Sequence, residues 1–492
     1  MLAHNPLSVE RVTGRCDVML RPGWNRLLVK LSSSNKEDYT EQRLCLRISD
    51  PPDVEYESRN IFWMTELRGR STGTPIIVGD RIFLTAEPDE LMCLDKLSGQ
   101  VLWTAAINYY EALTPAERSA RPGLANVEPL VAELKGEKDA ARRMMLRAKL
   151  RDALAEIDAA HFKMQFDGHF EAHFGIVGFT MATPVSDGAR VYVWHGSGVA
   201  ACYDLAGNRQ WITRVETGPL TYGSSPALAD GVLACFLNRL YGLDAKTGRV
   251  LWEQPRVSRN VGAILAAKFN GESVFITQRG ETIRPSDGAL LHRPRGDFSG
   301  DTGWSPGVVL GDLLYQPKYG VTHLGIFDFS GVKENSPEPR LVGTIETPPE
   351  VSRKSDGGWI DRWTAGSPLV HEGLVYQTDI YQTLYVFDVT TRKMIYRREL
   401  DLAGLTHYNA VAVAASPTLV GHSVLVCDNQ GNTLVLAPGR EFRQLARNSI
   451  ATQLDRSLPL PAQETLAYAP PIADAGRFYL RGERYLYCVG DK

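Results

Sequence analysis

The residues of this chain that could do chemistry begin with two histidines, His169 and His173, in the stretch DGHFEAHFGIVGF. On a helix, imidazoles four positions apart share a face and could supply two ligands to a metal ion. A metal ion needs three or more ligands, yet no HExxH motif is present, and Asp167 and Glu171 lie at no recognised ligand spacing. We therefore interpret both histidines as hydrogen-bonding residues of a binding loop and predict no metal site.

A second group combines aromatic and charged side chains: Trp304, Trp359 and Trp363, with Asp361 and Arg362 beside the last two. Aromatic faces next to a carboxylate and a guanidinium suit a sugar, a planar cofactor or a peptide. The alternative is that these tryptophans only pack their own loops. The predicted ligand-binding residues also include His407 and Tyr408, in the stretch LAGLTHYNAV.

The sequence offers no nucleophile or redox motif. There is no GxSxG motif, and the seven cysteines form no CxxC or CxxCH pattern. Cys93 and Cys202 each stand two residues before a recurring Asp, where other copies have Gly242 or Val386. We expect both to be small buried strand residues rather than disulfide partners.

The net charge is close to zero, because 54 Lys and Arg residues stand against 57 Asp and Glu residues, which leaves −3 at pH 7. No basic block stands out, so we expect no nucleic-acid partner. No apolar stretch approaches the length that spans a bilayer. The first residues also lack the charged and apolar regions of a signal peptide.

One phrase recurs along the chain: an Asp, then a Gly, then a Trp. It is complete at Asp95, Gly99 and Trp103, at Asp204, Gly207 and Trp211, and at Asp244, Gly248 and Trp252. Gly supplies the positive φ of a tight hairpin, and Asp can accept hydrogen bonds from the turn amides. The indole can lie against a neighbouring unit, which would stabilise the contact by roughly 4–6 kcal/mol at most. Later copies are worn, since one keeps only Gly288 and another has Arg392 and Tyr396 in place of Gly and Trp.

The phrase belongs to a unit of four short strands. It follows β-branched runs such as RIFLTA and RVYVWH, and each unit opens with a short segment around a proline, such as TGTP, MATP or GSSP. Asp204 and Asp244 lie 40 residues apart (244 − 204), the period of a β-propeller blade. With GAILAAKFNG as a degenerate fourth opening segment, the count predicts eight blades.

The two ends of the repeat predict how the ring closes. The last unit stops at Asp491 without an outer strand, whereas NIFWMTEL, with Trp63, is an extra strand before the first unit. Pairing these segments would remove the open edges of the ring. We predict an all-β fold, an eight-bladed propeller with this closure and one α-helical insertion.

The repeat and its opening segment SSPALADG resemble the PQQ-like, or quinoprotein-alcohol-dehydrogenase-like, eight-bladed propellers over residues 59–492. That superfamily includes PQQ-dependent dehydrogenases and the non-enzymatic propeller of the outer-membrane protein assembly machinery. The dehydrogenases usually stack the quinone between a Trp and a ring of adjacent, disulfide-bonded cysteines and hold a calcium ion. This sequence has no Cys-Cys pair. The resemblance implies a periplasmic or extracellular location.

Two segments depart from the repeat. Residues 105–178 carry an insertion, with a capping box at Thr114, Pro115 and Glu117 and a stripe of leucines, which predicts a helical hairpin or one long and one short helix. Residues 1–58 read as a short β segment, and LRPGWNRLLVKL resembles the closing strands of a galactose-binding-like jelly roll. We therefore expect the chain to be the C-terminal part of a larger product.

The sequence favours a non-catalytic, monomeric propeller without a cofactor that binds a protein or carbohydrate ligand at its loop-rich face. The alternative is a PQQ-dependent dehydrogenase, with calcium, that oxidises an alcohol or sugar. A third possibility is a scaffold whose helical arm and strand edges hold partner proteins.

Overall fold

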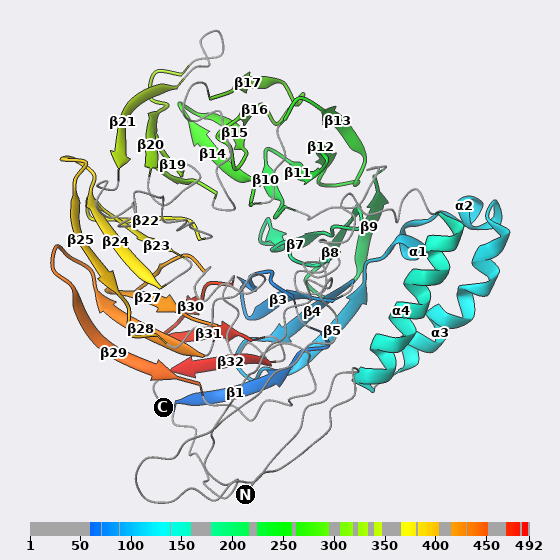
Figure 1. Ribbon diagram of the computed structural model, residues 1–492. Helices are drawn as coiled ribbons and strands as arrows, with labels where there is room; N and C mark the ends of the chain where they lie inside the picture. Colours follow the sequence, from blue (N-terminus) through cyan, green and yellow to red (C-terminus); the bar gives the residue numbers. More distant parts are fainter. Residues whose placement is uncertain are drawn as a thin grey trace, which may run out of the picture. The chain divides into compact units, whose positions relative to one another are not determined.

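The strands of this chain form eight four-stranded antiparallel sheets, arranged as blades around a ring (Figure 1). The all-β, eight-bladed propeller predicted from the repeat is confirmed. All described residues belong to one compact unit. The computed structural model describes residues 60–69, 71–87, 89–137, 139–158, 179–215, 224–257, 262–294, 306–317, 323–332, 339–346, 366–379, 382–402, 415–429, 431–450, 469–482 and 485–490.

Each blade runs from an inner strand near the ring's centre to an outer strand at its edge. Blades 1 and 2 are β2 (Ile76–Val78), β3 (Arg81–Ala86), β4 (Glu90–Asp95) and β5 (Val101–Ala106), then β6 (Val185–Ser186), β7 (Arg190–Trp194), β8 (Val199–Asp204) and β9 (Arg209–Arg214). Blades 3 and 4 are β10 (Ala227–Ala229), β11 (Val232–Leu237), β12 (Arg239–Asp244) and β13 (Val250–Gln254), then β14 (Leu265–Phe269), β15 (Glu272–Ile276), β16 (Thr282–Ile283) and β17 (Leu290–His292).

The second half of the ring repeats this order. Blades 5 and 6 are β18 (Val308–Leu310), β19 (Leu313–Pro317), β20 (His323–Asp328) and β21 (Arg340–Glu346), then β22 (Leu369–His371), β23 (Leu374–Thr378), β24 (Thr383–Asp388) and β25 (Met394–Glu399). Blade 7 is β26 (Thr418–Val420), β27 (Ser423–Cys427), β28 (Asn432–Ala437) and β29 (Arg443–Ser449). Blade 8 is β30 (Ile472–Asp474), β31 (Arg477–Arg481), β32 (Tyr485–Gly490) and β1 (Ile61–Glu66).

Blade 8 closes the ring as the sequence predicts. Strand β1 from the start of the repeat pairs antiparallel with β32 from its end, with Trp63 opposite Cys488 and Glu66 opposite Tyr485. Both backbone edges of β32 are therefore paired, and the first and last segments of the propeller share one sheet.

The Asp and Gly of the recurring phrase build the turn before each outer strand. Asp95 Oδ1 accepts hydrogen bonds from the amides of Leu97 (3.1 Å) and Ser98 (2.7 Å), and Asp244 bonds its turn in the same way. Gly99 has φ +73° and Gly248 has φ +75°, which an L side chain rarely adopts. A hydrogen bond from the Ser98 side chain, helped by the turn amides, lowers the pKa of Asp95.

The Trp of the phrase joins each blade to the next. Trp103 donates its indole N–H to the carbonyl of Leu205 (3.1 Å), Trp211 donates to Ala245 (3.0 Å) and Trp252 to Pro285 (2.7 Å). In each case the acceptor lies in the phrase of the following blade. The indole rests on the Gly of that same turn, so a Cβ at Gly248 would lie 2.5 Å from Trp211. A Gly is therefore needed here for the neighbour's indole as well as for its own φ.

Between blades 5 and 6, where the repeat is degenerate, the glycine and the large side chain have exchanged places. In blade 5 the position of the Trp is Gly343, and in blade 6 the position of the Gly is Arg392, which keeps a positive φ of +60°. A Cβ at Gly343 would overlap the guanidinium of Arg392. Arg392 also donates to the carbonyl of Val342 (2.6 Å). The large group therefore comes from the following blade instead of the preceding one.

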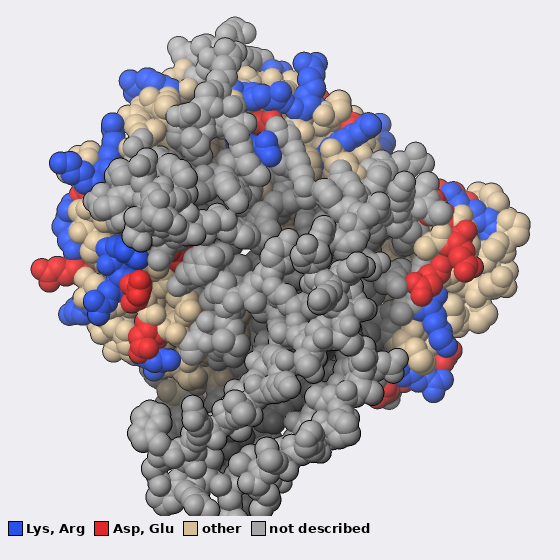
Figure 2. All heavy atoms as spheres, in the orientation of Figure 1, with Lys and Arg blue, Asp and Glu red and all other residues tan. Residues whose placement is uncertain are grey.

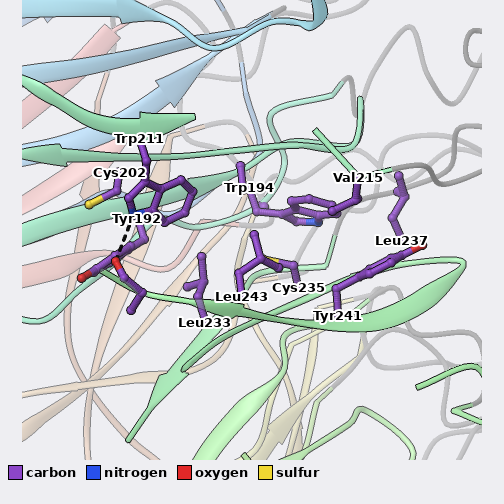
Figure 3. Close-up of a cluster of buried hydrophobic side chains, with 13 residues drawn as sticks. Tyr192, Trp194, Cys202, Trp211, Val215, Leu233, Cys235, Leu237, Tyr241 and Leu243 are labelled. Atoms are coloured by element: carbon purple, nitrogen blue, oxygen red, sulfur yellow. Dashed lines mark hydrogen bonds between the residues drawn. The ribbon is translucent and has the colours of Figure 1, made fainter. Parts of the chain in front are cut away.

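Buried apolar side chains fill the space between adjacent blades. Figure 3 shows Tyr192, Trp194 and Trp211 of blade 2 packed against Leu233 and Cys235 of blade 3. All of them are buried. Burial raises the pKa of the Cys202 thiol to about 12, and Cys93 and Cys202 are free thiols, as expected from their place in the repeat.

Helices lie between β5 and β6, at the outer side of the ring (Figure 1). They are α1 (Tyr109–Ala112), α2 (Pro115–Ser119), a 3-10 turn η1 (Pro122–Asn126), α3 (Glu128–Gly136) and α4 (Ala140–Ile157). The predicted capping box is present, because Thr114 and Glu117 cap each other's backbone amides. The leucines at 146, 150 and 154 are buried, which is the stripe that the sequence indicates.

Within the described residues, no helix is long and apolar enough to cross a membrane. The predicted β segment at residues 1–58, including its likeness to a jelly roll, lies outside the described residues.

Candidate functional site

The two faces of the ring differ in what they carry. Because the four strands of a blade alternate in direction, the turn between its second and third strands lies on the same face as the connection to the next blade. We call this the connection face; the Asp–Gly turns lie on the opposite face. The residues predicted to bind a ligand belong to the connections, and all lie outside the described residues: His169, His173, Trp304, Trp359, Asp361, Arg362, Trp363, His407 and Tyr408.

The described part of the connection face begins with a turn that several blades share. His195, Asp379 and Asp428 occupy one position, where the backbone N–H bonds the carbonyl four residues later at 3.0 Å. In blades 6 and 7 the aspartate side chain also accepts the amide of that later residue, Thr383 or Asn432, at 2.9 Å. These carboxylates are fully buried and cap their turns.

His195 occupies this position in blade 2 with a different chemistry. Its ring Nδ1 lies 3.1 Å from the carbonyl of Ile107, and a carbonyl only accepts, so Nδ1 carries the proton. Burial lowers the pKa of His195 to about 4, and the imidazole is neutral at pH 7. Nε2, which bears the lone pair, is buried and has no hydrogen-bond partner among the described residues.

Arg481 lies at the closure of the ring, at the end of β31. Its guanidinium is buried and donates to the carbonyls of Gly73 (2.6 Å) and Thr85 in blade 1. Burial lowers the pKa of Arg481 to about 9, and the charge of Glu87 partly opposes this shift. The guanidinium therefore stays charged at neutral pH, yet its Nε has no hydrogen-bond partner in the described part of the chain.

Unused hydrogen-bonding capacity gathers on the connection face. Buried polar side-chain atoms without a partner among the described residues occur here at Thr72, His195, Ser197, Gln316, Gln377, Thr378 and Arg481. They come from blades 1, 2, 5, 6 and 8. Leaving such groups unpaired costs free energy, and they often mark places where a ligand or water completes the bonding. The set consists of hydroxyl, amide, imidazole and guanidinium groups, which suits recognition of a polar ligand.

The Ser and Thr residues just before the prolines of the opening segments hold the inner strands together at this face. The Thr74 amide donates to the Thr183 hydroxyl (3.1 Å), and the Thr183 amide donates to that of Ser225 (3.0 Å). Between blades 6 and 7 the amide of Ser367 bonds the hydroxyl of Ser416 (2.9 Å). The sequence shows the Ser/Thr–Pro pattern but not this belt, because each bond joins two different blades.

Sequence reasoning missed His195 and Arg481. The only local signal for His195 is the turn-forming stretch WHGSG, and none marks Arg481, whose partners lie in blade 1. Within the described ranges there is no group of three or more His, Cys, Asp or Glu residues that could hold a metal ion. The predicted ligand-binding residues stay predictions.

Comparison with known proteins relates the fold to several others. The sequence profile of the family described as outer membrane protein assembly factor BamB matches residues 53–137 and 169–254. No curated protein matches the sequence.

Two solved structures illustrate the likeness of fold, and the values for a third are given beside them. Sqt1 of Saccharomyces cerevisiae has a TM-score of 0.55 and 8% identity, with 88% of this chain and 99% of that one covered. A quinohemoprotein alcohol dehydrogenase from Pseudomonas putida HK5 has a TM-score of 0.51 and 11% identity, over 87% of this chain and 76% of that one. BamB from Moraxella catarrhalis has a TM-score of 0.40 and 14% identity, over 62% and 95%. The chain is thus an eight-bladed β-propeller with PQQ-like repeats, similar in its first blades to the BamB family of assembly factors.

Proposed function

We propose that this propeller is a non-catalytic binding protein that recognises a partner protein or a carbohydrate at its connection face. The observation that carries the proposal is the set of buried polar atoms on that face, from Thr72 round to Arg481, that have no hydrogen-bond partner among the described residues. The predicted aromatic and charged residues, such as Trp363 and Arg362, belong to the connections of the same face.

The family likeness supports a protein as the partner. The matching family is described as an outer membrane protein assembly factor, and this description favours a protein ligand and a location in the periplasm, next to the outer membrane. Among the described groups of this face, Asp379 and Asp428 cap their own turns and His195 is neutral at pH 7.

The second candidate is a PQQ-dependent dehydrogenase, which the likeness of fold to quinohemoprotein alcohol dehydrogenases favours. The described cysteines differ from those of the usual quinone site. The cysteines described are buried, free thiols in five different strands, so they provide no adjacent disulfide against which the quinone could stack. Burial also raises the pKa of Cys93 and Cys427 to about 12, which keeps both as thiols.

Titration with PQQ and Ca²⁺ separates the two candidates. We expect no saturable change in quinone absorbance at micromolar concentrations, and no dye-linked oxidation of alcohols or sugars. Saturable quinone binding with turnover would replace the proposal by the dehydrogenase.

Site-directed photo-crosslinking tests the binding face itself. A benzoyl-phenylalanine at Asp361, in a connection, should give a protein adduct in the native extract. The same group at Leu310 should give none, because Leu310 ends an inner strand on the opposite face. Leu310 is a fair control because its side chain is 53% exposed. Adducts only from position 310 would contradict the proposal. If the ligand is a carbohydrate, saturation-transfer NMR with neutral sugars tests its binding.

A further inference from the structure

The outer strands of blades 6 and 7, with the turns that lead into them, form a basic surface that the proposed binding face does not include. We call it the β25–β29 surface, and its basic residues are Arg392, Lys393, Arg397, Arg398, Arg440, Arg443 and Arg447. The acidic residues of the same segments are Asp388, Glu399, Asp401 and Glu441, of which Asp388 is buried beneath Arg440. Figure 2 shows basic side chains, with acidic ones among them, along the edge of the ring where these strands lie.

Direct contacts make the two strands one continuous surface. The Arg398 guanidinium lies 5.2 Å from the ring centre of Phe442, and the ring of Tyr396 meets Phe442 edge-on at 6.2 Å. Arg447 pairs with Asp401, just beyond β25, at 2.7 Å. At the seam between the two blades, these contacts hold the Arg398 guanidinium against the ring of Phe442 and that of Arg447 against the Asp401 carboxylate.

The guanidinium groups of this surface are accessible. The side chain of Arg440 is 62% exposed, and that of Arg447 is 36% exposed. Leu445, between Arg443 and Arg447, is itself 49% exposed. Both β25 and β29 are edge strands of their sheets, so no strand of the described residues covers them.

The chain itself shows what covers such arginines elsewhere on the ring. On β9, the outer strand of blade 2, Arg209 pairs with Glu111 at 3.2 Å and Arg214 pairs with Glu117 at 3.5 Å. Arg214 also lies 5.3 Å from the ring centre of Tyr109, and only 12% of its side chain is exposed. Two carboxylates from α1 and α2 thus pair with the arginines of one outer strand. Together with Tyr109 they cover Arg214, whereas Arg209 stays 39% exposed.

We propose that the β25–β29 surface docks an acidic segment of a partner protein, one that presents carboxylates together with an aromatic side chain. The carboxylates would pair with Arg398, Arg443 and Arg447, and the aromatic ring would pack on Tyr396 and Phe442 beside Leu445. The partner thereby does for blades 6 and 7 what α1 and α2 do for blade 2. This site is independent of the connection face, and either can exist without the other.

Fluorescence anisotropy with a labelled dodecapeptide of alternating Glu and Tyr tests the proposal. We expect the full chain to bind it, with an affinity that falls as salt is raised. The double variant Arg398→Glu/Arg447→Glu should weaken binding by roughly tenfold to a hundredfold. A peptide of alternating Gln and Tyr should bind weakly to all proteins.

The matched control is Arg249→Glu/Arg256→Glu, which makes the same change of charge at exposed arginines of blade 3 and should leave peptide affinity unchanged. Thermal unfolding followed by circular dichroism checks that both double variants are folded. Equal binding by all three proteins, or no binding by the wild type, overturns the proposal. So does binding to phosphatidylglycerol vesicles but not to the peptide, or a dimer of this chain that Arg398→Glu/Arg447→Glu disperses.

Discussion

Two regions of the ring, the first blades and the seam between blades 5 and 6, fill the gap between adjacent blades in opposite ways. From blade 1 to blade 4, Trp103, Trp211 and Trp252 each reach forward onto the next turn and rest on its glycine. Between blades 5 and 6, Arg392 reaches back over Gly343. The gap therefore requires one large planar group and one glycine, and the two can exchange blades.

The largest expected effect is the loss of a forward-reaching indole. Trp211→Ala empties a site in which the side chain is 8% exposed, packs on Gly248 and donates to Ala245. We expect a loss of about 3–5 kcal/mol in the free energy of unfolding, measured by urea denaturation. Tyr396→Ala, at the same position in blade 6, should cost less because Tyr396 is only half-buried. Equal costs would mean that blades 2 and 6 do not differ at this position.

The exchange of large group and glycine predicts a strong coupling between two blades. Gly343→Trp alone should destabilise the protein by about 3 kcal/mol, because the indole meets the guanidinium of Arg392. Adding Arg392→Gly should restore most of this loss, since it recreates the arrangement of blades 1 to 4. A double-mutant cycle should show a coupling of about 1–3 kcal/mol. Additive effects would show that Arg392 does not occupy the place of an indole.

This exchange marks the limit of what the sequence predicts about the fold. The repeat is local, so the number of blades, the pairing of β1 with β32 and the role of Asp95 and Gly99 follow from spacing and turn chemistry. From the sequence, Arg392 looks like a degenerate copy of the repeat glycine. Its partner Gly343 lies in another blade, and a local sequence pattern cannot show which residues of two blades pack together.

The candidate site is less predictable for a related reason. The connections are rich in polar and aromatic residues, which points to a binding face but fixes no geometry. His195 and Arg481 become notable only through burial and through acceptors in other elements, Ile107 and Gly73. Tertiary packing alone creates these properties.

Blades 2, 6 and 7 share one turn position, which is His195 in blade 2 and Asp379 or Asp428 in blades 6 and 7. We expect the His195 turn to make the free energy of unfolding depend on pH. The folded-state pKa of His195 is about 4, below the ordinary 6.5, so the unfolded chain takes up the extra proton. The stabilisation is complete above pH 6.5 and is lost as the pH falls toward 4, with a loss of about 2 kcal/mol at pH 5. His195→Asn, which keeps a donor for Ile107, should lose less stability than the wild type between pH 7 and 5. Identical pH profiles from urea denaturation would contradict this role.

Two glycines separate backbone strain from contact with an indole. Gly248 and Gly231 have φ of +75° and +74°, but a Cβ at Gly248 would strike Trp211, whereas one at Gly231 would meet nothing within 4 Å. Both alanine variants should carry a similar backbone cost of about 1 kcal/mol. Gly248→Ala should cost about 1–2 kcal/mol more, by thermal or urea unfolding. If the two variants were equal, the indole would not be pressed against the turn.

The smallest expected change in the free energy of unfolding comes from removing an indole N–H, at Trp63 in the closing blade or at Trp211 inside the ring. Trp211 donates to Ala245, whereas the Nε1 of Trp63 is buried without a partner in the described residues, and Tyr479 contacts the equivalent carbonyl, that of Lys96, at 3.4 Å. Phenylalanine removes the N–H in both cases, but only Trp211→Phe leaves a carbonyl unpaired. It should therefore cost about 1 kcal/mol more than Trp63→Phe in urea denaturation. A larger cost for Trp63→Phe would contradict this expectation. It would show that the closing blade depends on its indole for a reason other than the hydrogen bond of the indole N–H.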